Sequence, residues 1–366
     1  MSRLAEPPEA EVDSDPVLSP LVPLWFRASD MGDVRLLPTR FDRRLRSGEL
    51  CGPFEVTRCV EATDSRHVYE ARHSYMGRTA TLKTYPIRQA LEGRSVDIFH
   101  EAQDLTEIRH ANLETVWDAG VEHQVLWIAG EPLRGRSLRA RLSRGVPLEA
   151  ALALHVAEQV ASGLQVAHER RIVHRDLRPE VIILETEGHV VVTDLGVARL
   201  LRLGAGETPG KVLGTPAYIA PERLLGESED RRADVYSLGL ILYEMLAGRH
   251  PYARSDTPLD LPDPKELARQ QILEIPPRLD ILAPWVPAPL ADIVDRATDK
   301  NPDRRPGTMD ELASELRVCR REIATGSIPS VRTEAPPVTQ MAWAWVATAL
   351  LVFGLLAGAL ALVLML

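Results

Sequence analysis

Cysteine is scarce in this chain, because only three of its 366 residues, Cys51, Cys59 and Cys319, are of this type. An odd number without metal-ligand spacing gives no disulfide framework and no metal site. Positive charge is also in short supply, since the formal net charge is -9. Nucleic acid is therefore not an expected partner. The cysteine content is typical of a protein from a reducing compartment.

A basic and apolar signal sequence is missing from the N-terminus, where acidic residues and proline dominate. Such a composition buries too little apolar surface to fold. We predict that residues 1–52 form a largely disordered segment. An adaptor function, in which this acidic segment binds a partner, is one hypothesis for it.

Charge is absent from residues 342–366, which read AWAWVATALLVFGLLAGALALVLML. At a rise of about 1.5 Å per residue this run exceeds the hydrocarbon core of about 30 Å, and it has no polar face. We predict a single transmembrane helix in the lipid bilayer. Arginines precede it, so the body of the protein is expected in the cytoplasm. Gly354 and Gly358 have GxxxG spacing, which would permit a homodimer, although this spacing is common by chance.

Between these ends the hydrophobic pattern changes character. Residues 53–130 contain the short strand-like runs FEVTRCV, HVYEAR, TATLKTY and VLWIAG around one helical stretch at 95–108. Residues 148–323 are mostly helical, and we place the second lobe at 134–323. We expect an α+β fold with a small sheet-rich lobe and a larger helical lobe, followed by a Pro/Ser/Thr-rich linker at 324–341.

Short motifs follow one another through this region. Lys83 ends the run TATLK, and Glu101 lies on the next helical stretch. HRDL contains Asp176 and VVVTDLG contains Asp194, followed by GTPAYIAPE, ADVYSLG and NPDRRP. Each motif alone is weak, but in this order they resemble the protein kinase family, specifically the bacterial Hanks-type serine/threonine kinases. The resemblance implies a bilobal protein kinase domain over residues 53–323.

The implied reaction is transfer of a phosphoryl group from ATP, with Mg2+ or Mn2+, to hydroxyls of protein substrates. This chemistry requires positioning and charge neutralisation. By the resemblance, Lys83 would bind the α and β phosphates with Glu101 as its partner, and Asp194 would bind the metal ion. Asp176 would orient the acceptor hydroxyl. Arg178 stands where the family has a lysine and retains the positive charge.

The adenine end of the site is also implied by the resemblance. The backbone carbonyl of Glu131 and the N–H of Leu133 would contact adenine, Ile183 would supply an apolar floor, and Gly130 occupies the gatekeeper place. Thr81 replaces the small alanine that normally covers the adenine.

Regulatory and structural residues follow from the same resemblance. Arg175 would neutralise a phosphate on the activation segment, for which Thr208 is a candidate, although Thr208 is as readily an ordinary loop residue. Thr215 would help to shape the acceptor site, and Asp234 would anchor the catalytic loop. The remaining pair, expected to form a buried ion pair, is Glu222 and Arg305.

Glycine is missing where the family has its phosphate-binding loop. The ungapped register places that loop on residues 61–66, EATDSR. Glu61 and Asp64 would bring negative charge towards the triphosphate, at about 1 to about 4 kcal/mol for each contact at 4 Å, unless Arg66 compensates. Val181 replaces the asparagine that binds a metal ion in the family, and valine cannot ligate a metal.

These departures leave two main functions open. One is a membrane-anchored serine/threonine protein kinase with weakened phosphoryl transfer and weak nucleotide binding. The alternative is a catalytically inactive pseudokinase that binds or regulates partner kinases.

Overall fold

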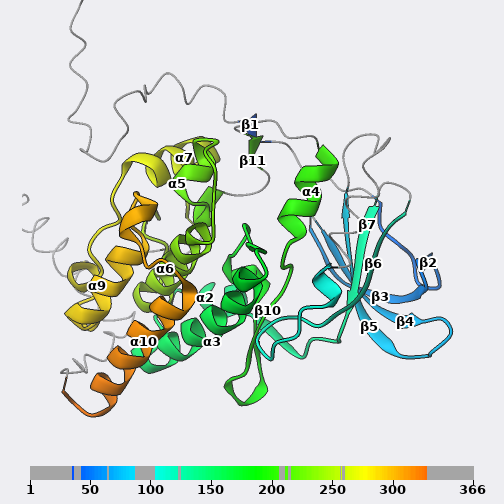
Figure 1. Cartoon of the computed structure of the whole chain (residues 1–366), viewed down its shortest axis with the longest axis horizontal. Helices are drawn as coiled ribbons and strands as arrows, with labels where there is room; N and C mark the ends of the chain where they lie inside the picture. Colours follow the sequence, from blue (N-terminus) through cyan, green and yellow to red (C-terminus); the bar gives the residue numbers. More distant parts are fainter. Residues whose placement is uncertain are drawn as a thin grey trace, which may run out of the picture.

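A curved sheet and a group of helices lie side by side in the computed structural model (Figure 1). The structure describes residues 35–36, 43–63, 66–86, 104–122, 125–205, 211–212, 216–255, 257 and 260–327. Within them, the predicted order of a small sheet-rich lobe followed by a larger helical lobe is confirmed.

The first lobe is an antiparallel sheet of six strands in the order β2-β3-β4-β5-β7-β6. Strand β7 lies between β5 and β6 and is buried along its whole length, which explains its unbroken apolar sequence VLWIAG. The strands are β2 (Leu50–Cys51), β3 (Phe54–Ala62), β4 (His67–His73), β5 (Thr79–Pro86), β6 (Val116–Glu122) and β7 (Val125–Gly130).

The sheet begins earlier than the domain boundary predicted at residue 53. Strand β2 pairs with β3, and Leu45 packs against the core of the sheet. The backbone N–H of Leu45 also donates a hydrogen bond to the Tyr69 hydroxyl, 3.0 Å away. Residues 43–52, which the composition assigned to the disordered segment, therefore belong to the folded lobe.

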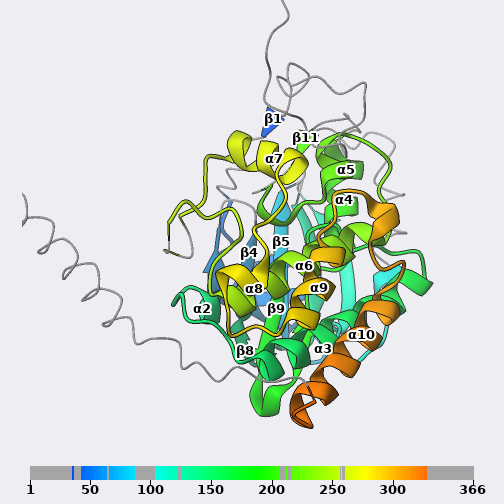
Figure 2. The same ribbon diagram turned by 90° about the vertical axis from the view of Figure 1, so that its left-hand side faces the viewer.

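The second lobe is built around α6 (Arg232–Ala247), which is buried on nearly every side and contacts both α3 and α9 (Figure 2). Gly248 ends this helix in the left-handed conformation, as glycine commonly does at a helix C-terminus. The other helices are α2 (Leu138–Leu142), α3 (Ala150–Glu169), α4 (Val197–Ala205), α5 (Pro221–Leu224), α7 (Pro264–Leu273), α8 (Leu279–Leu282), α9 (Ala288–Ala297) and α10 (Met309–Ala324).

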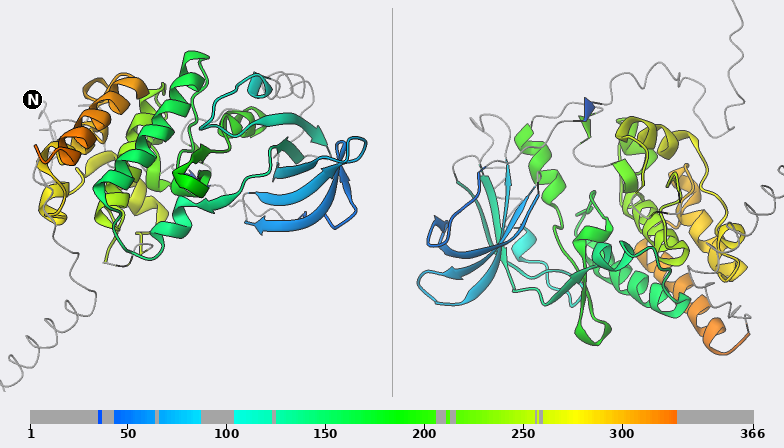
Figure 3. Two further views of the ribbon diagram at one scale, coloured as in Figure 1. Left: turned by 90° about the horizontal axis from the view of Figure 1, so that it is seen from below. Right: turned by 180° about the vertical axis from the view of Figure 1, so that it is seen from behind.

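A smaller sheet and the chain segment before β6 connect the two lobes (Figure 3). The small sheet contains β8 (Gly135–Ser137), β9 (Ile182–Glu185) and β10 (Val190–Val192). Val192 exchanges backbone hydrogen bonds of 2.9 Å with Asn112 and Glu114, and the N–H of Glu131 donates to the carbonyl of Thr115 at 3.0 Å. These bonds form a backbone ladder across the lobe junction.

Two further features concern the ends of the chain. Strand β1 (Arg35–Leu36) pairs in parallel with β11 (Lys211–Val212), a segment between α4 and α5. No helix of the described residues is long and apolar enough to cross a bilayer. The span predicted at 342–366, with Gly354 and Gly358, lies outside the described residues, as does the linker beyond residue 327.

Candidate active site

The catalytic-loop motif is held by a buried carboxylate beneath it. Asp234 is inaccessible to solvent and accepts hydrogen bonds from the backbone N–H groups of His174, at 2.8 Å, and Arg175, at 2.9 Å. The His168 ring contributes another at 2.7 Å. Burial alone would raise the pKa of Asp234, but His168 and His174 together lower it below its ordinary value. Asp234 thus anchors the loop backbone as an ionised carboxylate.

Two site residues have left-handed backbone conformations that non-glycine residues rarely adopt. Arg175 has a φ of 68° and Asp194 a φ of 63°. Non-glycine residues in this region cost free energy, and they concentrate at functional sites. The ring of His174 contacts the carbonyl of Thr193 at 2.9 Å and so connects the two motifs.

The proposed acceptor-facing carboxylate remains accessible. The side chain of Asp176 is 40% exposed, and Arg178 Nε donates to its Oδ2 at 3.2 Å. Arg178 also lies 3.6 Å from Glu180, which in turn accepts from Arg139 at 2.8 Å. Arg178 therefore sits between two carboxylates, and Asp176 keeps an exposed edge towards solvent.

Lys83 lies in a buried cluster with two carboxylates. Its Nζ is 2.7 Å from Oδ1 of Asp194 and 2.7 Å from Oε2 of Glu114. Burial alone would lower the pKa of Lys83, but Asp194 and Glu114 outweigh it and raise that pKa above its ordinary value. Glu101, the partner expected from the resemblance, lies outside the described residues. Glu114 was not predicted to take part in the site.

Arg66, from the β3–β4 hairpin, contacts the same cluster. Thr63 and Arg66 close the β3–β4 hairpin, with Thr63 N donating to the Arg66 carbonyl at 2.9 Å and Arg66 N donating to Thr63 Oγ1 at 3.1 Å. The Arg66 guanidinium donates through Nη1 to Oδ2 of Asp194. Arg66 Nη2 is only 3.4 Å from Glu61, a marginal hydrogen bond. The predicted compensation of Glu61 by Arg66 is therefore secondary to the contact with Asp194.

The electrostatics of this cluster keep Asp194 ionised and Arg66 protonated. Burial alone would raise the pKa of Asp194, but Arg66 and Lys83 outweigh it and keep that pKa well below its usual range. Burial alone would lower the pKa of Arg66, yet the Asp194 charge raises it. The cluster thus holds two basic and two acidic side chains in direct contact, namely Arg66, Lys83, Asp194 and Glu114.

This arrangement does not fit a magnesium ion at Asp194 while Arg66 stays in place. Both oxygens of Asp194 already accept charge-assisted hydrogen bonds. Unit charges 4 Å apart interact by about 4 kcal/mol at an effective dielectric near 20, so a divalent ion at that separation from the Arg66 guanidinium would meet about 8 kcal/mol of repulsion from it. Val181 is fully buried in the main hydrophobic core and offers no ligand. No group of three or more His, Cys, Asp or Glu suited to a metal occurs among the described residues.

The adenine end is modified as well. The backbone N–H of Leu133 donates to Thr81 Oγ1 at 3.4 Å, so the residue that replaces the usual alanine contacts the expected adenine donor. A Cβ on Gly130 would meet the carbonyl of Thr115 at 2.6 Å, which explains why glycine occupies the gatekeeper place. Glu131 is exposed, and Ile183 on β9 is partly buried.

The regulatory arginine has an acidic partner in the chain itself. Arg175 Nε lies 3.2 Å from Oε1 of Glu229, and Arg223 lies 3.8 Å from the other oxygen of Glu229. Thr208 and Thr215 lie outside the described residues, so their predicted roles stay predictions. Arg175 and Arg223 thus share the single carboxylate of Glu229.

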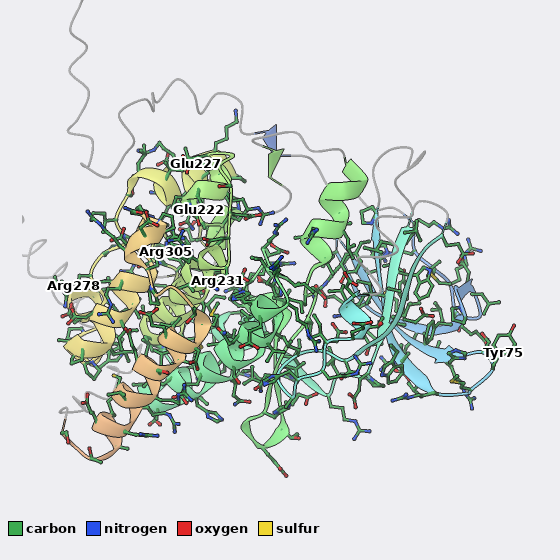
Figure 4. All side chains as sticks on the ribbon, in the orientation of Figure 1. Tyr75, Glu222, Glu227, Arg231, Arg278 and Arg305 are labelled. Atoms are coloured by element: carbon green, nitrogen blue, oxygen red, sulfur yellow. The ribbon has the colours of Figure 1, made fainter. Side chains whose placement is uncertain are left out.

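The ion pair expected deep in the helical lobe is present. Both guanidinium Nη atoms of Arg305 donate to Glu222, each at 2.8 Å (Figure 4). Both side chains are almost inaccessible to solvent. This bidentate pair joins the GTPAYIAPE and NPDRRP motifs.

A family model described as protein kinase domain matches residues 64–316. The chain is 28% identical over 269 residues to serine/threonine-protein kinase PrkC of Bacillus subtilis, covering 73% of this chain and 40% of that protein. It is 32% identical over 308 residues to serine/threonine-protein kinase Pkn1 of Myxococcus xanthus, covering 80% and 43%.

A third relative has a more similar length. Serine/threonine-protein kinase PknL of Mycobacterium tuberculosis is 28% identical over 293 residues, covering 80% of this chain and 71% of that protein. The match spans less than half the length of PrkC and of Pkn1. The resemblance to bacterial serine/threonine kinases is confirmed by these names. The chain therefore belongs to the protein kinase domain family.

Proposed function

We propose that this chain is a serine/threonine protein kinase that transfers phosphate from ATP to protein hydroxyls at a reduced rate. The observation that carries this proposal is Asp176, whose carboxylate is partly exposed on a loop that Asp234 holds in place. Family members use ATP with a divalent metal ion, and their catalysis is mainly positioning and charge neutralisation. Asp176 and Lys83 retain the residue types for these tasks.

The proposed step is a displacement at the γ-phosphorus. An acceptor serine or threonine hydroxyl lies against Asp176 and gives its proton to that carboxylate as its oxygen bonds to phosphorus. The bond to the bridging oxygen breaks, and ADP leaves with that electron pair. Lys83 and Arg66 would supply positive charge near the phosphates, and Arg178 donates a hydrogen bond to Asp176. The reduced rate follows from Val181 and from the missing loop glycines.

Phosphate incorporation tests this proposal. The full-length chain is incubated with ATP, and its intact mass is compared with that of Asp176→Asn. Asp303→Asn is the matched control, because Asp303 is exposed and lies far along the chain in the helical lobe. We expect added phosphate in the parent and the control and none in Asp176→Asn, with equal thermal stability. No added phosphate in the parent would refute the enzymatic proposal.

The second candidate is a pseudokinase that binds or regulates partner kinases. The specific observation in its favour is that Asp194, the residue assigned to the metal, is engaged by Arg66 and Lys83. A pseudokinase would bind a partner kinase equally well with Asp176→Asn. Loss of partner binding in that variant would count against it.

We also propose that residues 342–366 anchor the protein in a membrane, with the kinase domain on the cytoplasmic side. The support is the length of that apolar run and the arginines before it. The full-length chain should stay with membranes after an alkaline wash, whereas a chain ending at residue 341 should be released. Equal release of both chains would refute the anchor.

A further inference from the structure

The β3–β4 hairpin delivers a cation to the place where a metal ion would bind. Its closing residues, Thr63 and Arg66, are hydrogen-bonded to each other in both directions. This fixes Arg66 immediately before β4, and its side chain contacts Asp194, 128 residues further along the chain. The hairpin has no glycine to bring backbone N–H groups against phosphates. It presents a guanidinium instead.

The contact between Arg66 and Asp194 is buried rather than superficial. Each side chain is only 7% exposed. A buried charge needs a partner of opposite sign, and an arginine fork suits carboxylates and phosphates. The second oxygen of Asp194 accepts from Lys83 at 2.7 Å. Asp194 is thus neutralised from two sides by the chain itself.

The loss of the second metal ligand belongs to the same pattern. Val181 lies in the hydrophobic core, where the family has an asparagine. A site that has lost one ligand and covered the other with a guanidinium has its positive charge built in. The cation at Asp194 is part of the protein, and it does not have to be recruited from solution.

We propose that Arg66 replaces the divalent cation at Asp194, so that the cleft binds a nucleoside triphosphate without metal. This inference rests on the proposed ATP site and specifies how its phosphates are neutralised. Arg66 keeps its bond to Asp194 and exchanges its marginal contact with Glu61, at 3.4 Å, for a phosphate oxygen. Lys83, which donates to Asp194 and Glu114 at 2.7 Å, provides the second cation.

Isothermal titration calorimetry of the full-length chain in non-ionic detergent tests the proposal, with ATP as the probe. ATP is titrated once with excess EDTA and once with excess magnesium. We expect the two Kd values of the parent to agree within about threefold. Arg66→Gln should weaken binding in EDTA at least about tenfold, and magnesium should restore it, because Asp194 regains a free oxygen.

Two further variants keep the test interpretable. Arg58→Gln removes the same charge from an exposed ion pair on β3 and should leave both Kd values unchanged. Arg66→Lys keeps the charge and should bind ATP in EDTA more tightly than Arg66→Gln. If Arg66→Gln fails to fold, the comparison of the parent with and without EDTA still decides.

The outcomes separate cleanly. Parent binding that weakens tenfold or more in EDTA, parent binding that is absent in both conditions, or equal binding by Arg66→Gln in EDTA would each overturn the inference. Metal-free ATP binding without phosphate incorporation would leave the inference standing and refute the kinase proposal. Phosphate incorporation with strictly metal-dependent binding would do the reverse.

Discussion

The partner of Lys83 can be identified by mutation, because the structure pairs it with Glu114. Glu114→Gln keeps the shape and an acceptor oxygen but removes the charge 2.7 Å from Lys83 Nζ. Lys83→Met removes the cation with a similar chain length. The double variant completes a thermodynamic cycle, which isolates the energy of the pair from the other effects of each change.

The size of the expected stability loss follows from the burial of the Lys83–Glu114 pair. The two side chains are 4% and 5% exposed, so water screens them little. Hydrogen bonds to charged groups contribute about 1.5 to 3 kcal/mol, and this is the expected loss in the free energy of unfolding for Glu114→Gln. In the Lys83→Met background the same change should cost less than about 0.5 kcal/mol, because a charge without its partner gives no benefit. The expected coupling energy is therefore at least about 1 kcal/mol.

Urea unfolding of the full-length variants, followed by circular dichroism, measures these energies. Glu107→Gln is the matched control, because Glu107 is exposed on the segment before Glu114. It should change stability by less than about 0.5 kcal/mol. The reasoning is refuted if Glu114→Gln costs no more than this control, or if it costs the same with and without Lys83. The same cycle on Glu101 measures the partner that the kinase resemblance assigned.

Two further predictions concern stability. Burial, followed by the charge of Arg305, lowers the pKa of Lys300 to about 7. In the unfolded chain Lys300 keeps its proton up to about pH 10. Between about pH 7 and about pH 10 the unfolded state therefore binds more protons than the folded state, and the free energy of unfolding rises with pH. Relative to Lys300→Met, the parent should gain about 2 to 3 kcal/mol between about pH 6 and about pH 9 in urea unfolding, and a constant difference would contradict this. Gly130→Ala should cost about 1 to 3 kcal/mol, because its Cβ would meet the Thr115 carbonyl at 2.6 Å. Gly307→Ala is the control and should lower the melting temperature far less, since its Cβ would meet only the flexible end of Glu311 at 3.5 Å.

Local hydrophobic patterns predicted much of the fold. The runs predicted as strands from FEVTRCV, HVYEAR, TATLKTY and VLWIAG correspond to β3, β4, β5 and β7. Strand β6 was not predicted, because a register shift between Val116 and Asp118 and four half-buried positions blur its alternation. Leu45 and β2 were assigned to the N-terminal segment, because the acidic composition before them concealed a short apolar contact.

The site was less predictable, because its decisive contacts join residues far apart in the chain. The motifs indicated Lys83, Asp176 and Asp194 by type. Nothing local indicates that Arg66 would reach Asp194 instead of Glu61, since that depends on how the sheet lies over the helical lobe. The only signal for Glu114 is a charged residue in the mostly apolar stretch ANLETVW.

The backbone ladder at the lobe junction has a mechanical consequence. Residues 112–116 are bonded to β10 on one side and to Glu131 on the other. If the lobes swing apart, this ladder is the pivot, and displacement grows with distance from it. Glu114 lies on the rotation axis and would stay close to Asp194. Arg66, beside the turn of the β3–β4 hairpin, lies farther from that axis and would move more. A small rotation would therefore separate Arg66 from Asp194 before it disturbed Lys83.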